Sequence, residues 1–137
     1  MNRQGSCQCG AVRITATADP ITTRSCWCKD CQKLTGGGPT YNAFFKTEQV
    51  EIVGEVRWHD VPADSGNMLS RGFCPNCGSQ LVVQSHARRH LIGIRIGAFD
   101  DNDDLGPRST ISTVSAPAWA HLDPNLPRTD RQPPPLG

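Results

Sequence analysis

The sequence predicts a single, mainly β domain. Its 137 residues fit one domain and leave no room for a second. Many short stretches rich in β-branched residues are separated by turns that draw on 13 glycines and 11 prolines. Hydrophobic residues make up 36% of the chain, below the usual share of about 45–50%, which also counts glycine. We therefore expect a turn-rich fold with a thin core that needs covalent or metal crosslinks.

Strand-like stretches dominate the chain. Residues 11–18 alternate in polarity, so that Val12, Ile14 and Ala16 share one face of an expected strand. In residues 91–99, three isoleucines and Ala98 share a face in the same way. The expected strands cover residues 11–18, 40–45, 50–53, 56–61, 79–85, 91–99 and 108–115, with a turn at Gly54 and Glu55 between the third and the fourth.

Helix is scarce, and the chain ends in a proline-rich segment. One short helix is expected over residues 29–34, with Asp30 near its start and the glycines at 36–38 ending it. The segment from Asp123 onward carries five prolines and cannot pair into a central sheet. We therefore expect a folded domain over residues 1–122 and a tail over 123–137, which is extended along the surface or mobile, or lies across a partner subunit.

The charge balance and the hydropathy exclude several classes of protein. The chain has 14 Lys and Arg against 13 Asp and Glu, a formal charge of +1, so a strongly basic nucleic-acid binder is not expected. No apolar run approaches the roughly 18–20 residues that cross a bilayer, and the N-terminal ten residues lack a secretory apolar region. We expect a soluble, cytoplasmic protein with neither membrane nor nucleic acid as its partner.

Cysteine is the most informative residue type in this chain. Seven is an odd number and the compartment is expected to be reducing, which argues against a disulfide framework and favours metal binding or catalysis. Thiolates are soft ligands, and a tetrahedral site of four sulfurs suits zinc. The cysteines form three groups, which are Cys7 with Cys9, Cys26 with Cys28 and Cys31, and Cys74 with Cys77.

The spacing of these groups leaves two pairings open. In the first, Cys28 and Cys31 join Cys74 and Cys77 in a zinc ribbon, whose 42 intervening residues are long for that pattern. In the second, the pair at positions 7 and 9 joins the pair at 74 and 77, which leaves Cys26, Cys28 and Cys31 as a group of three. Four protein ligands are typical of a structural zinc, and three with an open position are typical of a catalytic zinc.

Three strings of the sequence carry a resemblance to a known family. GSCQCGAVR, SCWCKDCQKLTGG and RGFCPNCGSQL resemble, in this order, the motifs of the glutathione-dependent formaldehyde-activating enzymes, the GFA or CENP-V-like family. The segments SAPAW and LDPNLP resemble the closing part of the family, so the resemblance runs from Gly5 to about Pro127. It implies a β-rich fold of the Mss4-like type for the expected domain over residues 1–122.

The resemblance also implies the metal sites and the reaction. It implies a structural zinc on Cys7, Cys9, Cys74 and Cys77, and a second zinc on the catalytic residues Cys26, Cys28 and Cys31, where a substrate thiol or water completes the coordination. The implied function is carbon–sulfur lyase or adduct-forming chemistry on a small thiol conjugate, with glutathione and formaldehyde as the named case. Three thiolates hold zinc less tightly than four, so we expect the second zinc to be labile.

Zinc bound by three thiolates suits this chemistry. The site carries a formal charge of −1, which makes the zinc a weak Lewis acid toward inert bonds but a good partner for a fourth sulfur. Coordination deprotonates a thiol, and the thiolate can add to an aldehyde or release one in the reverse step.

Two positions depart from the family pattern, and four histidines bear on the same site. Trp27 and Thr110 stand where the family often has histidine. Because alternate residues of an extended segment face opposite ways, we expect Trp27 to cover the sulfur site rather than line a pocket. A histidine that joined the three cysteines would close the second site, since zinc accepts three cysteines and one histidine. The histidines are His59, His86, His90 and His121.

Charged and glycine residues near the cysteines are candidates for substrate binding. Arg71 stands three residues before Cys74, and Lys29 and Lys33 flank Cys31, so each could bind a substrate carboxylate. The backbone amides around Gly37 could cradle an anion. The alternative for the lysines and the arginine is a solvated surface position, and for the glycines a helix stop.

Two further functions compete with the enzyme. The first is a zinc-stabilised binding module for a protein or nucleic-acid partner without catalysis, which a closed second site would favour. The second is thiol redox chemistry at Cys28 and Cys31, although that motif usually belongs to a βαβ context that this chain lacks. The extended tail is also compatible with a homodimer.

Overall fold

The computed structural model describes residues 2–137 and consists mainly of β-strands in two sheets. The prediction of a mainly β domain with short helical turns is confirmed. The strands are β1 (Arg3–Ser6), β2 (Arg13–Ala16), β3 (Thr22–Cys26), β4 (Thr40–Lys46), β5 (Val50–Val53), β6 (Arg57–Pro62), β7 (Met68–Phe73), β8 (Gln80–Ser85), β9 (Leu91–Arg95) and β10 (Ser109–Ile111).

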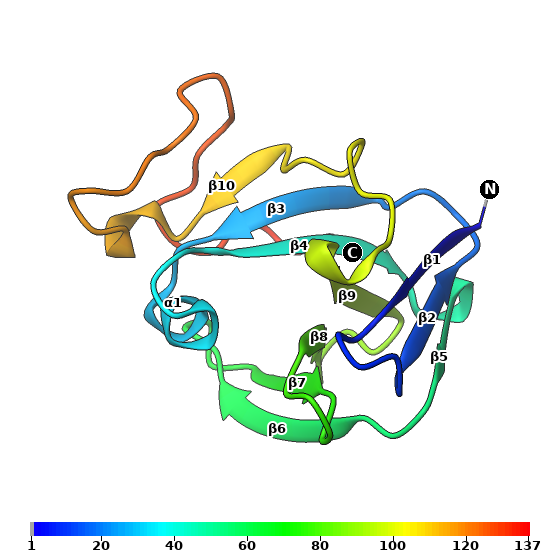
Figure 1. Cartoon of the computed structure of the whole chain (residues 1–137). Coiled ribbons are helices and arrows are strands. Elements are labelled where there is room, and N and C mark those ends of the chain that lie inside the picture. The colour runs from blue at the N-terminus through cyan, green and yellow to red at the C-terminus, as the bar shows by residue number, and fades with distance from the viewer. Residues whose placement is uncertain (1) are drawn as a thin grey trace.

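The smaller sheet has the strand order β1–β2–β5, and both of its pairings are antiparallel. The alternation expected around β2 is present, because Val12, Ile14 and Ala16 are buried while Arg13 is exposed. Gly5 of β1 forms an isolated bridge to Phe99, and this bridge ties the small sheet to the chain that follows β9. In Figure 1 this sheet lies at the opposite end of the molecule from α1.

The larger sheet has the order β10–β3–β4–β9–β8–β7–β6, and only the β10–β3 pair is parallel. It curves from β10 round to β6, and α1 lies at its open side (Figure 1). The register aligns Arg24 with Asn42 and Asn42 with Arg95. Farther along the sheet, Gly93 aligns with Val83 and Val83 with Arg71. Because side chains alternate along a strand, these residues share one face of the sheet.

The hydrophobic core fills the space between the two sheets. Phe45 is fully buried and meets Phe99 edge to face, with 5.9 Å between the ring centroids. Leu81, Val82 and Ile94 from β8 and β9 are also fully buried around it.

The helix α1 (Lys29–Thr35) agrees with the expected one and is a single residue longer. The sulfur of Cys28 caps its start by accepting a hydrogen bond of 3.2 Å from the Cys31 amide. Gly36 ends it in the left-handed conformation with φ 87°, which a residue with a side chain rarely adopts. Among residues 2–137, no helix has the length and apolar character needed to cross a bilayer.

Two of the expected strands end several residues earlier in the structure. The strand expected over 91–99 ends at Arg95, because the chain turns into a 3-10 helix at Ile96–Ala98 that still buries its apolar side chains. The strand expected over 108–115 ends at Ile111, because Ser112 takes the left-handed conformation with φ 57° before a 3-10 turn. Residues 50–61 form no hairpin, since β5 and β6 belong to different sheets.

Three strands were not expected from the sequence, namely β1, β3 and β7. Their residues are RQGS, TTRSC and MLSRGF, and none of the three shows a clear alternation of polar and hydrophobic residues. Each is fixed by pairing with a neighbouring strand rather than by its own composition.

The proline-rich tail runs along the free edge of β10. Thr110 donates a hydrogen bond to the carbonyl of Pro127 and accepts one from the amide of Thr129, at 3.0 and 2.9 Å. The tail is therefore extended along the surface, one of the arrangements expected from its composition. It forms no named helix or strand within residues 123–137. The domain boundary at residue 122 stays a prediction.

We predict that Gly5→Ala destabilises the fold. A Cβ at this position would overlap the backbone of Ala98 and Phe99, which cannot move without breaking the bridge between the sheets. Overpacking against backbone should lower the free energy of unfolding by roughly 1–3 kcal/mol or more, measured by urea denaturation. The matched control is Gly106→Ala, where a Cβ meets open space. Equal stability of the two variants would contradict this account of the junction.

Candidate metal centres and their cavity

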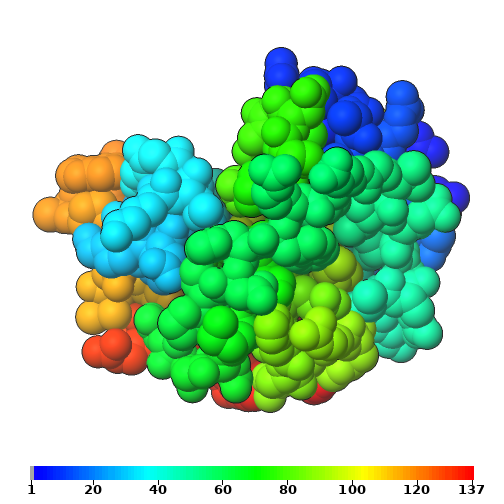
Figure 2. Space-filling view, turned by 90° about the horizontal axis from the view of Figure 1, so that it is seen from below, coloured from blue at the N-terminus to red at the C-terminus, as the bar shows by residue number. Residues whose placement is uncertain are grey.

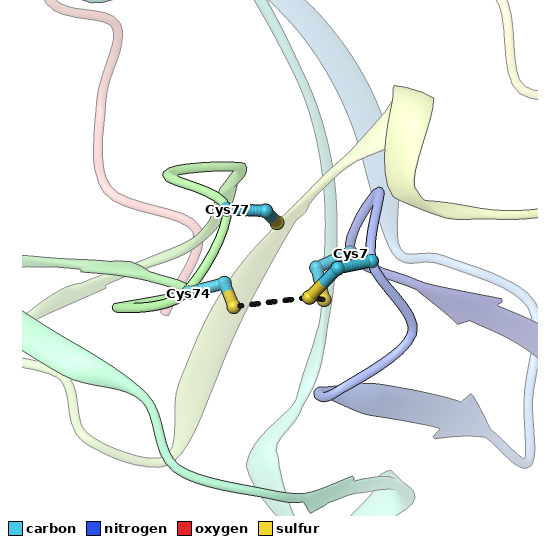
Figure 3. Close-up of side chains that lie close together, drawn as sticks. Cys7, Cys74 and Cys77 are labelled. Atoms are coloured by element: carbon cyan, nitrogen blue, oxygen red, sulfur yellow. Dashed lines mark hydrogen bonds between the residues drawn. The ribbon is translucent and has the colours of Figure 1, made fainter.

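Four cysteines from two distant turns converge at one point. Cys7 and Cys9 lie in the turn after β1, and Cys74 and Cys77 lie in the turn between β7 and β8. All four sulfur atoms lie within 4.8 Å of one another. Figure 3 shows Cys7 facing Cys74 and Cys77 across the gap between these turns. The structure thus groups the cysteines as in the second of the two pairings that the spacing left open.

Local backbone geometry presents these four sulfurs. Gly78 adopts a positive φ of 79° directly after Cys77, and its amide donates a 2.8 Å hydrogen bond to the carbonyl of Cys74. The hydroxyl of Ser79 lies 3.2 Å from the sulfur of Cys77. Hydrogen bonding from Ser79, first by its side chain and then by its backbone, lowers the pKa of Cys77. The turn therefore favours a thiolate at this position.

The four-sulfur group fits a tetrahedral metal ion. The sulfurs of Cys7 and Cys9 are 3.6 Å apart, and those of Cys9 and Cys74 are 3.8 Å apart. Zinc–sulfur bonds of about 2.3 Å place two ligands of a tetrahedron about 3.8 Å apart. All seven cysteines of the chain are free thiols, as expected. The geometry and the ligand type are both consistent with zinc.

The remaining three cysteines form a second group around the start of α1. Cys26 ends β3, Cys28 caps α1 and Cys31 lies in its first turn, and their sulfurs also lie within 4.8 Å of one another. Cys26 and Cys31 are buried, and Cys28 is half-buried. Within residues 2–137, no histidine or carboxylate joins this group at that distance. The protein therefore supplies three sulfur ligands here and four at the other group.

Polar contacts affect the pKa values of these three thiols. The hydroxyl of Thr40 donates a 3.1 Å hydrogen bond to the sulfur of Cys31. Contacts with the thiols of Cys26 and Cys28, aided by Thr40, lower the pKa of Cys31. Contacts with Cys28 and Cys31, together with burial, raise the pKa of Cys26. The three thiols are therefore coupled through their mutual contacts, and Thr40 supplies an additional donor to Cys31.

A cavity of about 290 Å³ borders the three-cysteine group and follows the sheet face described above. Its wall includes all three of these cysteines, four arginines and two aspartates. Figure 2 shows the molecule from below, where residues of the β6–β7 region and the tail lie near one another at the surface. The charged residues of the wall are Arg24, Asp30, Asp64, Arg71, Arg88 and Arg95.

The candidate substrate-binding residues lie in different places. Arg71 is buried in the cavity wall, and its Nη2 lies 3.6 Å from Oδ2 of Asp30. Lys29 is exposed, and it does not border the cavity. Gly37 lies past the other end of α1, and its amide already donates a 2.9 Å hydrogen bond to the carbonyl of Gln32. Lys33 is also exposed and does not border the cavity, so of these four residues only Arg71 lines the cavity beside the three-cysteine group.

Trp27 is buried and does not line the cavity, as expected, while its role in covering the sulfur site stays a prediction. Its ring meets Trp119 at 77° with 6.3 Å between the centroids. Thr110, the second departure from the family pattern, is buried in β10, where its hydroxyl lies 3.3 Å from that of Ser25.

Sequence reasoning missed two residues beside the three-cysteine group. Thr40 contacts Cys31 directly, and Arg95 is buried in the wall of the same cavity. A signal for Arg95 exists in the sequence, because it is the only charged residue in the stretch LIGIRIGAF. A charge in an otherwise apolar strand needs a partner or a function. No comparable signal marks Thr40, since threonine is common in strands.

We predict that removing residues 133–137 exposes Cys28. Pro133, Pro134, Pro135 and Leu136 line the cavity that Cys28 borders. Iodoacetamide should therefore alkylate Cys28 severalfold faster in the truncated protein than in the full chain. The reaction is followed by mass spectrometry of the reduced protein. Cys9 is the internal control, because it is exposed and belongs to the other group. An unchanged rate at Cys28 would show that the tail does not cover it.

A curated relative and a solved structure are similar to this chain over most of its length. A protein from Halomonas elongata, named "Putative glutathione-dependent formaldehyde-activating enzyme", is 27% identical over 126 residues, covering 88% of this chain and 80% of that protein. A crystal structure of a Rhodobacter sphaeroides protein superimposes with a TM-score of 0.58, at 20% identity, over 75% of this chain and 94% of the other. That likeness supports the fold.

The family comparison covers most of the chain and all seven cysteines. Residues 2–115 match the model of the family described as "Glutathione-dependent formaldehyde-activating enzyme". On this match over nearly its whole length, the chain belongs to the family of glutathione-dependent formaldehyde-activating enzymes.

Proposed function

We propose that this protein is a zinc-dependent enzyme that forms or cleaves a carbon–sulfur bond in a small thiol conjugate of the glutathione–formaldehyde type. The observation that supports this most directly is the group of Cys26, Cys28 and Cys31. It offers three sulfurs beside a cavity and has no fourth protein ligand among residues 2–137. Membership of an enzyme family agrees with this proposal. A carbon–sulfur lyase is the reaction class that we assign.

The two sulfur groups have different roles in this proposal. Cys7, Cys9, Cys74 and Cys77 would hold a structural zinc, because four protein sulfurs complete a tetrahedron. Cys26, Cys28 and Cys31 would hold a second zinc, and they are the residues to which we assign catalysis. When bound there, zinc supplies a site for one further sulfur and lowers the pKa of that thiol.

Protein groups around the second site hold its sulfurs in place. The Cys31 amide and the Thr40 hydroxyl donate hydrogen bonds to Cys28 and Cys31, respectively. Such outer contacts orient ligands and temper their charge. Cys26 Sγ lies 3.7 Å from the Ser112 hydroxyl, so each of the three sulfurs has a polar neighbour. The half-buried Cys28 marks the side from which a substrate thiol approaches.

The proposed reaction balances without an oxidant or a reductant. In the forward direction the substrate sulfur bonds to the aldehyde carbon, the carbon–oxygen π bond opens, and the oxygen takes up a proton equivalent to the one that the thiol released. In the reverse direction the sulfur–carbon bond breaks and the aldehyde leaves. We assign Arg71, which lines the cavity, to bind a negatively charged part of the substrate. This role stays a prediction, as do those of Lys29 and Gly37, the homodimer and the cytoplasmic location.

The first test of this function measures zinc per chain in freshly purified, reduced protein with and without glutathione. We expect Cys26→Ser to lose a second, labile zinc while keeping the tightly held one, and we expect the wild type to retain the labile zinc better with thiol. Cys7→Ser is the matched control and should lose the tight zinc. Two equally tight ions that are indifferent to thiol would favour the binding module without catalysis.

The second test measures turnover. Cys28→Ser should keep helix α1, because serine is also a good N-cap, but it replaces one of the three sulfurs. Exchange between glutathione, formaldehyde and their adduct, followed by nuclear magnetic resonance, should slow by at least roughly 100-fold, the upper range for losing even an outer contact of a metal site. Circular dichroism checks that the variant is folded. Full activity in the folded variant would refute catalysis at this group.

A further inference from the structure

Arg95 is a buried cation whose position is set by the sheet. It is the last residue of β9, it pairs in register with Asn42 of β4, and only 8% of its surface is exposed. Its side chain forms part of the cavity wall, as do the three cysteines of the second group. Lysine and arginine are almost never fully buried unless they are paired, so its partners need to be accounted for.

One end of the Arg95 guanidinium is satisfied by the protein. Its Nη1 donates a 2.6 Å hydrogen bond to Oδ1 of Asn42, and Nδ2 of Asn42 donates one of 3.1 Å to the hydroxyl of Thr40. The Thr40 hydroxyl in turn donates to Cys31. This chain of hydrogen bonds orients the guanidinium relative to the three-cysteine group.

The other edge of the same guanidinium has no partner. Nε and Nη2 of Arg95 are both buried, and neither forms a hydrogen bond with any group in residues 2–137. A buried donor without a partner is costly. Folding removes these two donors from water and so already includes the free-energy cost of their desolvation. A ligand that accepts both hydrogen bonds recovers much of that cost, which makes this edge of the guanidinium suited to binding a ligand.

The charges around the cavity favour an anion. Its wall carries four arginines against two aspartates, and it contains no lysine, histidine or glutamate. Asp30 contacts Arg71 at 3.6 Å and is half-exposed, and Asp64 is exposed. No carboxylate of the described chain is within salt-bridge distance of Arg95. Three thiolates with a bound zinc ion carry a formal charge of −1 together. With this charge included, the wall is still positive before a substrate binds.

The geometry of the free edge selects the kind of anion. Nε–H and Nη2–H point in nearly the same direction and form a planar fork, which matches the two oxygens of a carboxylate. We infer that Arg95 binds a carboxylate of the thiol substrate through this fork, and that it thereby selects thiols that carry a carboxylate. The side-chain movement needed to admit the ligand is common in binding sites. This inference rests on the proposed function, because it assumes that a thiol enters the cavity.

The test compares two thiols that differ in one group. We would titrate 3-mercaptopropionate and 3-mercapto-1-propanol into reduced, zinc-loaded protein by calorimetry, and take the ratio of their dissociation constants. The wild type should prefer the acid by roughly 10- to 100-fold, the range for a charge-assisted pair of hydrogen bonds. Arg95→Gln should lose most of this preference while it binds the alcohol as before. Arg95→Lys, which keeps the charge without the fork, should recover only a minor part.

Controls separate a substrate contact from a structural role. Arg13→Gln is the matched control, because Arg13 is exposed on β2 in the other sheet. The ratio of the two dissociation constants in this variant should equal that of the wild type. Zinc content and circular dichroism are recorded for every variant, and Arg95→Lys provides the comparison if the glutamine variant is unfolded. A structural role of Arg95 would weaken the binding of both thiols equally and leave the ratio unchanged.

The outcomes distinguish this inference from the proposed function. If the wild type binds both thiols but does not discriminate between them, or if neither substitution at position 95 changes the ratio, the role of Arg95 is wrong while the thiol site stands. If the wild type binds neither thiol, the proposed function fails, and the inference fails with it. A preference for the acid that falls in both variants at position 95 and survives in Arg13→Gln supports the inference.

Discussion

The fold depends on the convergence of four sulfur atoms from two turns that lie more than 60 residues apart. Cys7 and Cys9 leave the small sheet, while Cys74 and Cys77 belong to a turn of the large sheet, so their cluster joins the two sheets at one end of the core. With only 36% hydrophobic residues, the core by itself offers limited stabilisation for 137 residues. A metal ion bound by four thiolates would close this junction and contribute binding free energy to folding.

The second sulfur group differs because of the elements that carry it. Cys26 ends a strand, and Cys28 and Cys31 begin a helix, so one short stretch of chain supplies all three sulfurs. At the junction of the sheets, by contrast, two opposing turns each supply a pair and surround the centre. The large sheet then curves past the three-cysteine group and leaves a cavity on its fourth side. A strand-to-helix connection thus yields an open site, and two facing turns yield a closed one.

Features that depend on local sequence were predictable, and features that depend on register were not. Alternation located β2, and Asp30 together with the glycines after Thr35 located α1, because these signals lie within a few residues. Spacing alone left the pairing of the cysteine groups open, because it says little about which turns meet in space, and only the family resemblance implied the pairing. Contacts such as Thr40 with Cys31 require the curvature of the sheet and the position of α1 above it. They become visible only when the strands are assembled.

Arg95 and the sulfur group stabilise each other's charged forms, and this reciprocity explains why a buried arginine is tolerated. Burial lowers the pKa of Arg95, and the nearby Cys31 counteracts that effect. The pKa of Cys31 is lowered by contacts with Cys26 and Cys28, by Thr40 and by the positive charge of Arg95. Because the interaction between two charges is shared, whatever favours the thiolate also favours the guanidinium. Arginine stays protonated in proteins, and at a buried position of low dielectric its unpaired edge can bind an anion strongly.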